Sequence, residues 1–207
     1  MKRLFLLGFS SIAASLFAQK NDTYIKANAL FLPIGMINVA VEHGFTDHIT
    51  GQAELFVSPW KSFAGHNALL GIASAEGRYY FDEAFKHWYV GASLGFSVFN
   101  LHKWNYWNDN FYVHKDGTVT PYISSNLYEK GYSFILGGVG GYQFQVNDRW
   151  NIDVYLGVGT VQSFYKGYDK ISGDRYDTEG DSMGRELNRS GEFLPFKGGV
   201  MISYKLN

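Results

Sequence analysis

The residues that suit nucleophilic chemistry lie far apart in this 207-residue sequence. Acyl transfer needs a nucleophile with a base within hydrogen-bond reach. His102, Asp181 and Ser182 are the candidates, and they lie in two long segments, 100–127 and 163–192. Because these residue types are common in loops, an accidental grouping is the simpler interpretation. An acyl hydrolase or transferase that acts on lipid A or phospholipid is therefore kept as an alternative function.

Metal-ligating residues form no complete motif. The sequence contains no cysteine, which excludes disulfides and thiolate metal sites. Asp177, Glu179 and Asp181 carry oxygens that suit calcium, but the full calcium-loop pattern is missing. We predict a solvated loop of mixed charge at this point, with neither a metal nor a cofactor.

A group of aromatic residues in segment 100–127 forms a candidate binding surface. Asparagines beside these rings suit sugar hydroxyls, and the rings themselves can stack on sugars or on another protein. Local packing against neighbouring loops and lipopolysaccharide is the alternative. The candidate residues are Trp104, Tyr106, Trp107, Phe111 and Tyr112.

Other charged residues share one face of extended segments. If that face lines the inside of a barrel, each charge needs a partner, since an isolated buried ion is costly. The planar guanidinium of Arg78 suits the bridging of several carboxylates. A proton or ion pathway is the alternative, but a barrel of eight strands is narrow enough for side chains to fill. We predict a structural ion-pair network of Lys26, Glu42, Glu54, Glu76, Arg78, Asp153, Lys197 and Lys205.

The elements that carry these residues alternate with a period of two. Successive side chains of a strand point to opposite faces, and in each segment one face is apolar while the other is polar or small. No helical period of useful length competes with this pattern. The pattern predicts strands over 23–31, 36–43, 49–58, 68–81, 88–99, 128–146, 150–162 and 193–206.

The connections between these segments differ in length from one end to the other. In an up-and-down barrel, odd and even connections lie at opposite ends. The even connections, 44–48, 82–87 and 147–149, are short, whereas the odd connections are 32–35, 58–67, 100–127 and 163–192, of which the last three are longer. Short turns at one end and long loops at the other are typical of outer-membrane proteins. We predict an all-β fold, an eight-stranded antiparallel up-and-down transmembrane β-barrel.

A soluble lipocalin-like barrel with a ligand cavity is the competing architecture, because alternation alone does not say which face is inside. Aromatic residues near the strand ends favour the membrane, where such rings lie at the level of the lipid headgroups. We expect one ring of them near the short turns and a second near the long loops. The first comprises Phe45, Phe81, Trp88, Phe144, Trp150 and Tyr204, and the second Phe31, Phe99, Phe164 and Phe196.

The composition agrees with a cell-envelope protein. Lys2 and Arg3 precede a short apolar run, which is typical of a secretory signal peptide. We therefore expect a signal peptide over 1–18 and a mature barrel over 19–207.

A formal net charge of −1 argues against a nucleic-acid partner. The expected partners are outer-membrane lipid and lipopolysaccharide, with an extracellular ligand or protein at the long loops.

Several short motifs, taken in order, resemble a small outer-membrane β-barrel family of unknown function from gut-type Gram-negative bacteria. The resemblance implies an outer-membrane barrel and supplies no activity. We therefore expect a non-enzymatic barrel with a polar, side-chain-filled lumen that serves envelope integrity or binds at its surface. The motifs are Lys26-Ala27-Asn28-Ala29-Leu30, Asn38-Val39-Ala40-Val41-Glu42, Ser58-Pro59-Trp60-Lys61, Glu76-Gly77-Arg78-Tyr79-Tyr80, Lys86-His87-Trp88-Tyr89-Val90-Gly91, 137–142 and Arg149-Trp150-Asn151-Ile152-Asp153.

Overall fold

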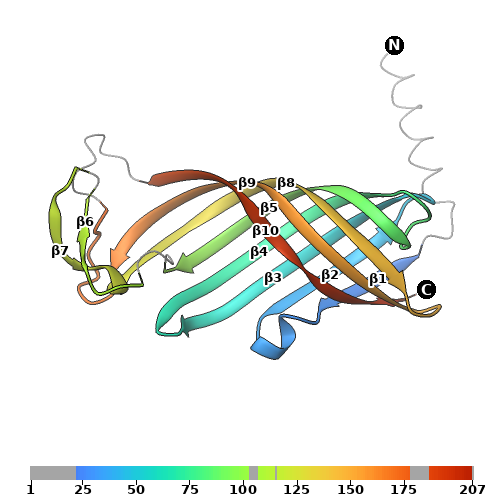
Figure 1. The fold of residues 1–207 in the computed structure, drawn as a ribbon, viewed down its shortest axis with the longest axis horizontal. Helices are drawn as coiled ribbons and strands as arrows, with labels where there is room; N and C mark the ends of the chain where they lie inside the picture. The colour runs from blue at the N-terminus through green and yellow to red at the C-terminus, as the bar shows by residue number, and fades with distance from the viewer. Residues whose placement is uncertain (1–21, 103–106, 115, 178–186, 207) are drawn as a thin grey trace, which may run out of the picture.

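The computed structural model describes residues 22–102, 107–114, 116–177 and 187–206 (Figure 1). The predicted signal peptide lies outside these residues. Among the described residues, no helix is long and apolar enough to cross a membrane.

Eight strands form one closed antiparallel barrel, and each strand pairs with two neighbours. The order around the ring is β1-β10-β9-β8-β5-β4-β3-β2, so that chain neighbours pair and the first and last strands close the ring. This confirms the all-β, antiparallel, up-and-down arrangement. The strands are β1 (Thr23–Asn28), β2 (Ile37–Gly44), β3 (Ile49–Phe63), β4 (His66–Tyr80), β5 (His87–Leu101), β8 (Leu127–Gln145), β9 (Trp150–Asp169) and β10 (Asn188–Lys205).

Several strands run further than the alternation predicted. The expected long connection 58–67 is wrong, because β3 and β4 continue until only Ala64 and Gly65 join them, both with positive φ (49° and 87°). β9 reaches Asp169 and β10 starts at Asn188, which shortens the predicted loop 163–192. Polar residues lie on both faces of these extensions, so the apolar alternation that marks a strand is lost there.

A small second sheet lies in the connection between β5 and β8. Its strands are β6 (Phe111–Val113) and β7 (Val119–Ile123), followed by the 3-10 turn Ser124–Asn126. The sequence pattern did not predict these strands. Figure 1 places this hairpin at the end of the molecule opposite the C-terminus, beyond the ring of long strands.

The first hairpin is much shorter than the others. β1 has 6 residues and β2 has 8, whereas the remaining barrel strands have 15 to 20. A single 3-10 turn, Leu32–Ile34, joins them, and Gly35 ends it with φ 72°. In Figure 1 the hairpin stays near the end that carries the C-terminus, while the other strands continue to the far end.

Burial follows the predicted alternation. Apolar side chains such as Leu94 (64% exposed) point outward, while charged side chains such as Arg78 (1% exposed) point into the ring. A lipocalin-like barrel requires the reverse, an apolar interior and a charged exterior. Buried Glu76, Arg78 and Asp153 therefore contradict that alternative.

The predicted aromatic ring near the short turns lies on the outer face. Phe45, Phe81, Trp88, Phe144 and Trp150 are all exposed, and the Tyr204 ring contacts that of Trp150 at a centroid distance of 4.8 Å.

The ring expected near the long loops is wrong in part. Phe164 contacts the ring of Tyr132 on the outer face (5.3 Å), but Phe99 lies in phase with the buried Ser97. Phe31 and Phe196 turn into the barrel, because β1 ends at Asn28 and a bulge interrupts β10 at 195–197.

Candidate functional site

The centre of the barrel holds a four-membered cluster of charges. Lys26 of β1 contacts the carboxylates of Glu42 and Asp153, the latter at 2.8 Å. Arg78 Nη1 donates to the same two carboxylates, at 3.2 Å to Glu42 and 2.9 Å to Asp153. All four side chains are fully buried. Each carboxylate is thus shared between two cations, one from β1 and one from β4.

A second cluster continues the network toward the long connections. Arg78 Nε donates to Glu76 at 2.5 Å, and the other Glu76 oxygen contacts Lys197. Lys197 also binds Glu54 at 3.1 Å. Glu76 therefore links the two clusters into one chain of ion pairs. Among the described residues this network contains four carboxylates and three cations.

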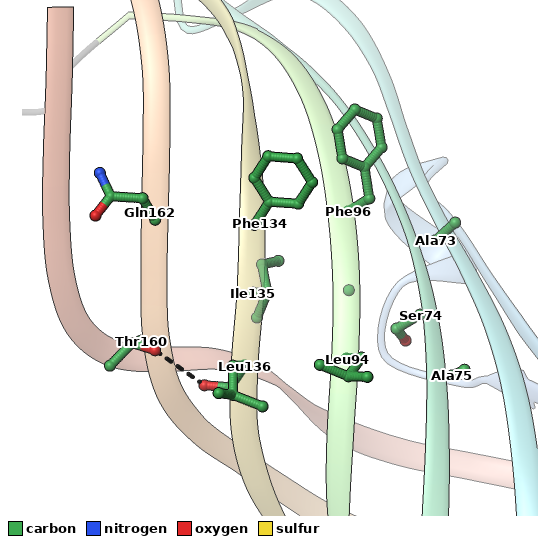
Figure 2. A pocket seen from close by; sticks show the side chains of 11 residues that line it. Ala73, Ser74, Ala75, Leu94, Phe96, Phe134, Ile135, Leu136, Thr160 and Gln162 are labelled. Atoms are coloured by element: carbon green, nitrogen blue, oxygen red, sulfur yellow. Dashed lines mark hydrogen bonds between the residues drawn. The ribbon is translucent and has the colours of Figure 1, made fainter.

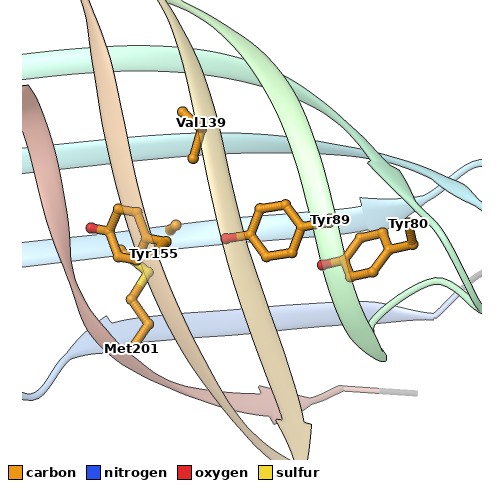
Figure 3. Close-up of a cluster of buried hydrophobic side chains, with 6 residues drawn as sticks. Tyr80, Tyr89, Val139, Tyr155 and Met201 are labelled. Atoms are coloured by element: carbon orange, nitrogen blue, oxygen red, sulfur yellow. The ribbon is translucent and has the colours of Figure 1, made fainter.

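Tyrosine hydroxyls complete the coordination of the carboxylates. Tyr80 donates to Glu42 at 2.9 Å, Tyr89 to Asp153 at 2.8 Å, and Tyr155 lies 3.4 Å from Glu54. Figure 3 shows these three rings side by side inside the barrel, with Val139 and Met201 beside them. The Tyr89 ring also faces the Arg78 guanidinium at 4.4 Å. Rings and ion pairs together fill this part of the lumen.

A buried phenylalanine closes the short-turn end. Phe85 lies in the turn between β4 and β5, is 4% exposed, and its ring contacts that of Tyr24 at 4.5 Å. Its backbone φ of 68° is unusual for a bulky residue, and Asn151 Nδ2 donates to its carbonyl at 3.1 Å. Sequence reasoning missed this residue because a turn position has no strand alternation.

The structure brings together seven of the eight residues predicted for the network and places the eighth elsewhere. Lys205 does not join the central clusters and pairs with Asp22 at 2.5 Å. Both side chains are about one third exposed, at the short-turn end of the barrel. The reason is that Lys205 is the last residue of β10, beyond the level of the filled lumen.

Between the network and the end with the long connections, the lumen contains a partly enclosed cavity of about 140 Å³. Its floor is polar and consists of Asn38, Glu54, Tyr155 and Lys197. Its walls are mainly apolar, and they are formed by Phe31, Phe56, Leu70, Ile72, Ile135 and Phe196. Side chains thus fill the lumen in the half near the short turns, as predicted, whereas this cavity leaves part of the other half unfilled.

The bulge in β10 shapes this cavity. Pro195 pairs with Val158 and Lys197 pairs with Gly157, so that Phe196 is the extra residue between them. Its ring lies over Gly137, where any side chain would overlap it. Glycine is therefore required at 137 for the ring to lie inside.

The outer face of the barrel is a broad apolar surface. Val39 and Val41 of β2, Leu94 and Phe96 of β5 and Leu156 of β9 are all exposed. Figure 2 shows one shallow hollow of this face, where Leu94 and Phe96 of β5 lie next to Phe134 and Leu136 of β8. Large exposed apolar surfaces mark sites of interaction with protein or membrane.

A family model described as a protein of unknown function (DUF3575) matches residues 4–206. The chain belongs to this family. A search of curated proteins finds no match. The DUF3575 description states neither an activity nor a location. The network and the cavity are therefore the features from which a function for this family member has to be argued.

The structure places only part of the predicted loop chemistry of this DUF3575 chain. His102 lies against His66, with ring centroids 4.3 Å apart, and the Trp107 ring stacks on that of His66 with centroids 4.6 Å apart. Asp181 and Ser182 lie outside the described residues. The predicted acyl-transfer set is therefore untested.

The aromatic candidates of the loop fall into three groups. Trp104 and Tyr106 lie outside the described residues. Phe111 (61% exposed) and Trp107 (51% exposed) present rings at the surface. Tyr112 packs on the buried Tyr176 at 4.8 Å, which is local packing.

Asp177, a candidate calcium ligand, is already engaged in structural contacts. Its carboxylate accepts hydrogen bonds from the Gly167 N–H at 2.8 Å, Arg175 Nε at 2.8 Å and Asn188 Nδ2 at 2.5 Å. Among the described residues, no group of three or more side chains is arranged to hold a metal ion. Glu179 and Asp181 lie outside those residues.

Proposed function

We propose that this DUF3575 chain is a non-enzymatic outer-membrane β-barrel whose lumen is closed by an ion-pair network. The observation that carries the proposal is the polarity of the ring, with four carboxylates and three cations buried inside and apolar side chains exposed outside. Lipid is the solvent in which an exposed apolar surface of this extent is stable. At the level where all eight strands pair, the closed ring also suits lipid, because the backbone groups of a closed sheet have partners.

The dimensions of the strands support this proposal. A tilted strand needs about 9–11 residues to cross a bilayer. Six of the eight barrel strands have 15 or more residues. Their outward residues, such as Val90, Leu136 and Val154, are apolar along the middle of each strand. The surplus length belongs to the end that carries the long connections.

The two ends suggest an orientation. The turns 45–48, 81–86 and 146–149 are short, and outer-membrane barrels place short turns in the periplasm. The β6–β7 hairpin and the connection from β9 to β10 would then face the outside. The exposed rings of Trp107 and Phe111 are the candidate contacts with lipopolysaccharide or an extracellular partner.

A structural role for the network follows from its geometry. Each of the four carboxylates contacts at least one cation, and three of them accept hydrogen bonds from tyrosine hydroxyls. Such fully engaged groups fix the relative positions of the strands that carry them.

Gel mobility and membrane extraction test the proposal. We expect the chain to fractionate with outer membranes, to resist release by high salt and alkali, and to dissolve only in detergent. Folded barrels also migrate differently from boiled samples on a denaturing gel, and we expect such heat-modifiable migration. Recovery as a soluble periplasmic monomer would contradict the proposal.

The non-enzymatic part of the proposal requires a separate measurement. We expect mass spectra of lipid A and phospholipid to show the same acyl chains in cells with and without the protein. A change in acyl-chain number that depends on His102 would support the acyl hydrolase or transferase alternative instead.

A further inference from the structure

The barrel wall lacks strand pairing beside the lumen cavity. The β1–β10 ladder ends at the pair Asn28–Met201, with one further bond from the Ala29 N–H to the Val200 carbonyl. The β2–β3 ladder ends at the pair Ile37–Val57. Beyond these points, the stretches 58–63 of β3 and 188–199 of β10 pair with a neighbouring strand on one side only among the described residues, and each of these ladders contains one irregularity. We call this part of the wall the open seam.

Three of the four prolines lie at the open seam. Pro59 lies in the one-sided part of β3, Pro195 in that of β10, and Pro33 in the 3-10 turn between β1 and β2. Proline has no N–H to donate and is found in sheets only at edges or bulges. These residues disfavour pairing of β3 with β10, so the seam is kept open by the covalent structure of the chain.

The open seam borders the cavity. Residues from all of its borders line the cavity, namely Phe31 from the β1–β2 connection, Phe56 from β3 and the stretch 196–198 of β10. Phe31 contacts Phe56 edge to face, with ring centroids 5.3 Å apart. Near the β1–β2 connection the surface at the seam is apolar, with Leu30, Leu32 and Ile34 exposed. Further toward the long connections the seam borders carry the exposed Phe193 and also the exposed charges of Lys61, Arg189 and Glu192.

The chemistry of the cavity selects an apolar guest. Its size is close to that of an engineered cavity of about 150 Å³, lined by Leu, Ile and Phe, that stays dry and binds benzene. Water needs two to four polar partners, but the floor atoms already bind one another. Asn38 donates to Glu54 at 2.8 Å, and Lys197 lies 3.1 Å from the same carboxylate.

We infer that the end of a lipid acyl chain enters this cavity sideways from the bilayer, through the open seam between β3 and β10. The inference rests on the proposed function, which supplies the bilayer. The seam begins beyond the Ile37–Val57 pair, and Val57 is the ninth residue of β3 counted from the short turns. Since a tilted strand needs about 9–11 residues to cross a bilayer, the start of the seam lies at the level of the outer leaflet, and the lipid belongs to that leaflet. The volume suits the terminal segment of one chain and not a whole lipid.

Photo-crosslinking tests the inference. The full chain is reconstituted in vesicles of phosphatidylethanolamine and phosphatidylglycerol, with a diazirine near the end of one acyl chain of the phosphatidylethanolamine. After illumination, peptide mass spectrometry locates the adducts. We expect adducts on Leu70 and Ile72, which line the cavity, in addition to Leu94 and Leu136 of the outer surface.

Filling the cavity provides the matched comparison. Ser74 lines the cavity, whereas its neighbour Ala73 is exposed on the outer face of the same strand. Ser74→Leu should abolish the cavity adducts and leave the outer ones, while Ala73→Leu should keep both. Ile72→Trp fills the same space from another position and replaces Ser74→Leu if that variant fails to fold.

The pattern of adducts separates the two proposals. Adducts on the outer surface without any in the cavity would overturn the acyl-chain inference and leave the proposed function standing. No adducts on either surface would overturn the proposed function itself. Cavity adducts from free diazirine-palmitate in detergent, with none from the vesicle lipid, would overturn entry from the bilayer.

Discussion

At the scale of single residues, Arg78 organises the interior. Its guanidinium contacts carboxylates of both clusters, Glu42 and Asp153 on one side and Glu76 on the other. The flat guanidinium offers several N–H donors in one plane, which a lysine ammonium does not. The sequence indicated this role, since Arg78 is the only arginine on the polar face of a predicted strand.

Replacing Arg78 tests whether the network stabilises the barrel. Removal of one partner from a buried ion pair costs about 3–5 kcal/mol, because the remaining charge stays buried. We therefore expect Arg78→Met to lower the free energy of unfolding by about this amount, and Arg78→Lys by less. Urea titration of the protein in detergent micelles, followed by tryptophan fluorescence, measures the change.

An exposed pair provides the control. Lys86 and Glu83 lie 2.7 Å apart in a turn, with side chains 35% and 61% exposed. Exposed pairs contribute about 0–1 kcal/mol, so Lys86→Met should leave the unfolding curve almost unchanged. Equal stability of Arg78→Met and Lys86→Met would show that the network does not stabilise the barrel.

At the scale of elements, the β1–β10 ladder closes the barrel with only five residue pairs. β1 contributes only Tyr24–Asn28 to this ladder. At the end of this ladder the Asn28 side chain links β1 to both of its neighbours. Its Nδ2 donates to Asn38 of β2 at 2.9 Å and lies 3.5 Å from the Gly198 carbonyl of β10. Gly199, with φ 152°, has no Cβ, and a Cβ at this position would overlap the Asn28 side-chain amide.

A methyl group at position 199 should weaken this closure. The Cβ of Gly199→Ala would overlap the Asn28 amide, and overpacking of this kind costs about 1–3 kcal/mol. Urea titration should show the loss for Gly199→Ala but not for Gly138→Ala, where the nearest atom lies at 3.8 Å. If the overlap is the cause, Asn28→Ala should add less destabilisation to Gly199→Ala than to the wild type.

The regular part of these elements was predictable from the sequence, and the irregular part was not. A period of two identified eight strands and their inner faces, because the alternation of apolar with polar or small side chains repeats over many residues. Phe31 and Phe196 were assigned to the wrong face, since a strand end and a one-residue bulge both shift the alternation. Pro33 and Pro195 were the available signals of these irregularities.

The Phe85 closure and the cavity depend on contacts between segments distant in the chain. The Phe85 ring contacts those of Tyr24 and Tyr80, and the Phe196 ring packs over Gly137. Alternation within one segment carries no information on such contacts. The ion-pair network was predictable only as a set of residues on one face, and not as two clusters joined through Glu76.

At the scale of the whole molecule, the interior is divided into a polar plug and an apolar cavity. The plug extends from Phe85 at the short turns to Lys197 at the cavity floor. The cavity is bordered by the open seam in the wall. A path for ions along the barrel axis would have to pass through the plug, whereas the cavity is reached from the side.

This division predicts that the barrel does not conduct ions. A hydrated ion on the barrel axis would have to displace Lys26 and Arg78 from Asp153, and each displacement leaves a buried charge without its partner. It would also have to pass the rings of Tyr80 and Tyr89, which lie 5.0 Å apart. We expect planar bilayers containing the purified chain to show no stepwise currents in concentrated potassium chloride, where an open porin added to the same bilayer does. Stepwise currents that grow with salt concentration would show that water and ions pass the plug. The ion-pair network would then be part of a conduction path, as in the alternative interpretation of the charged inner face.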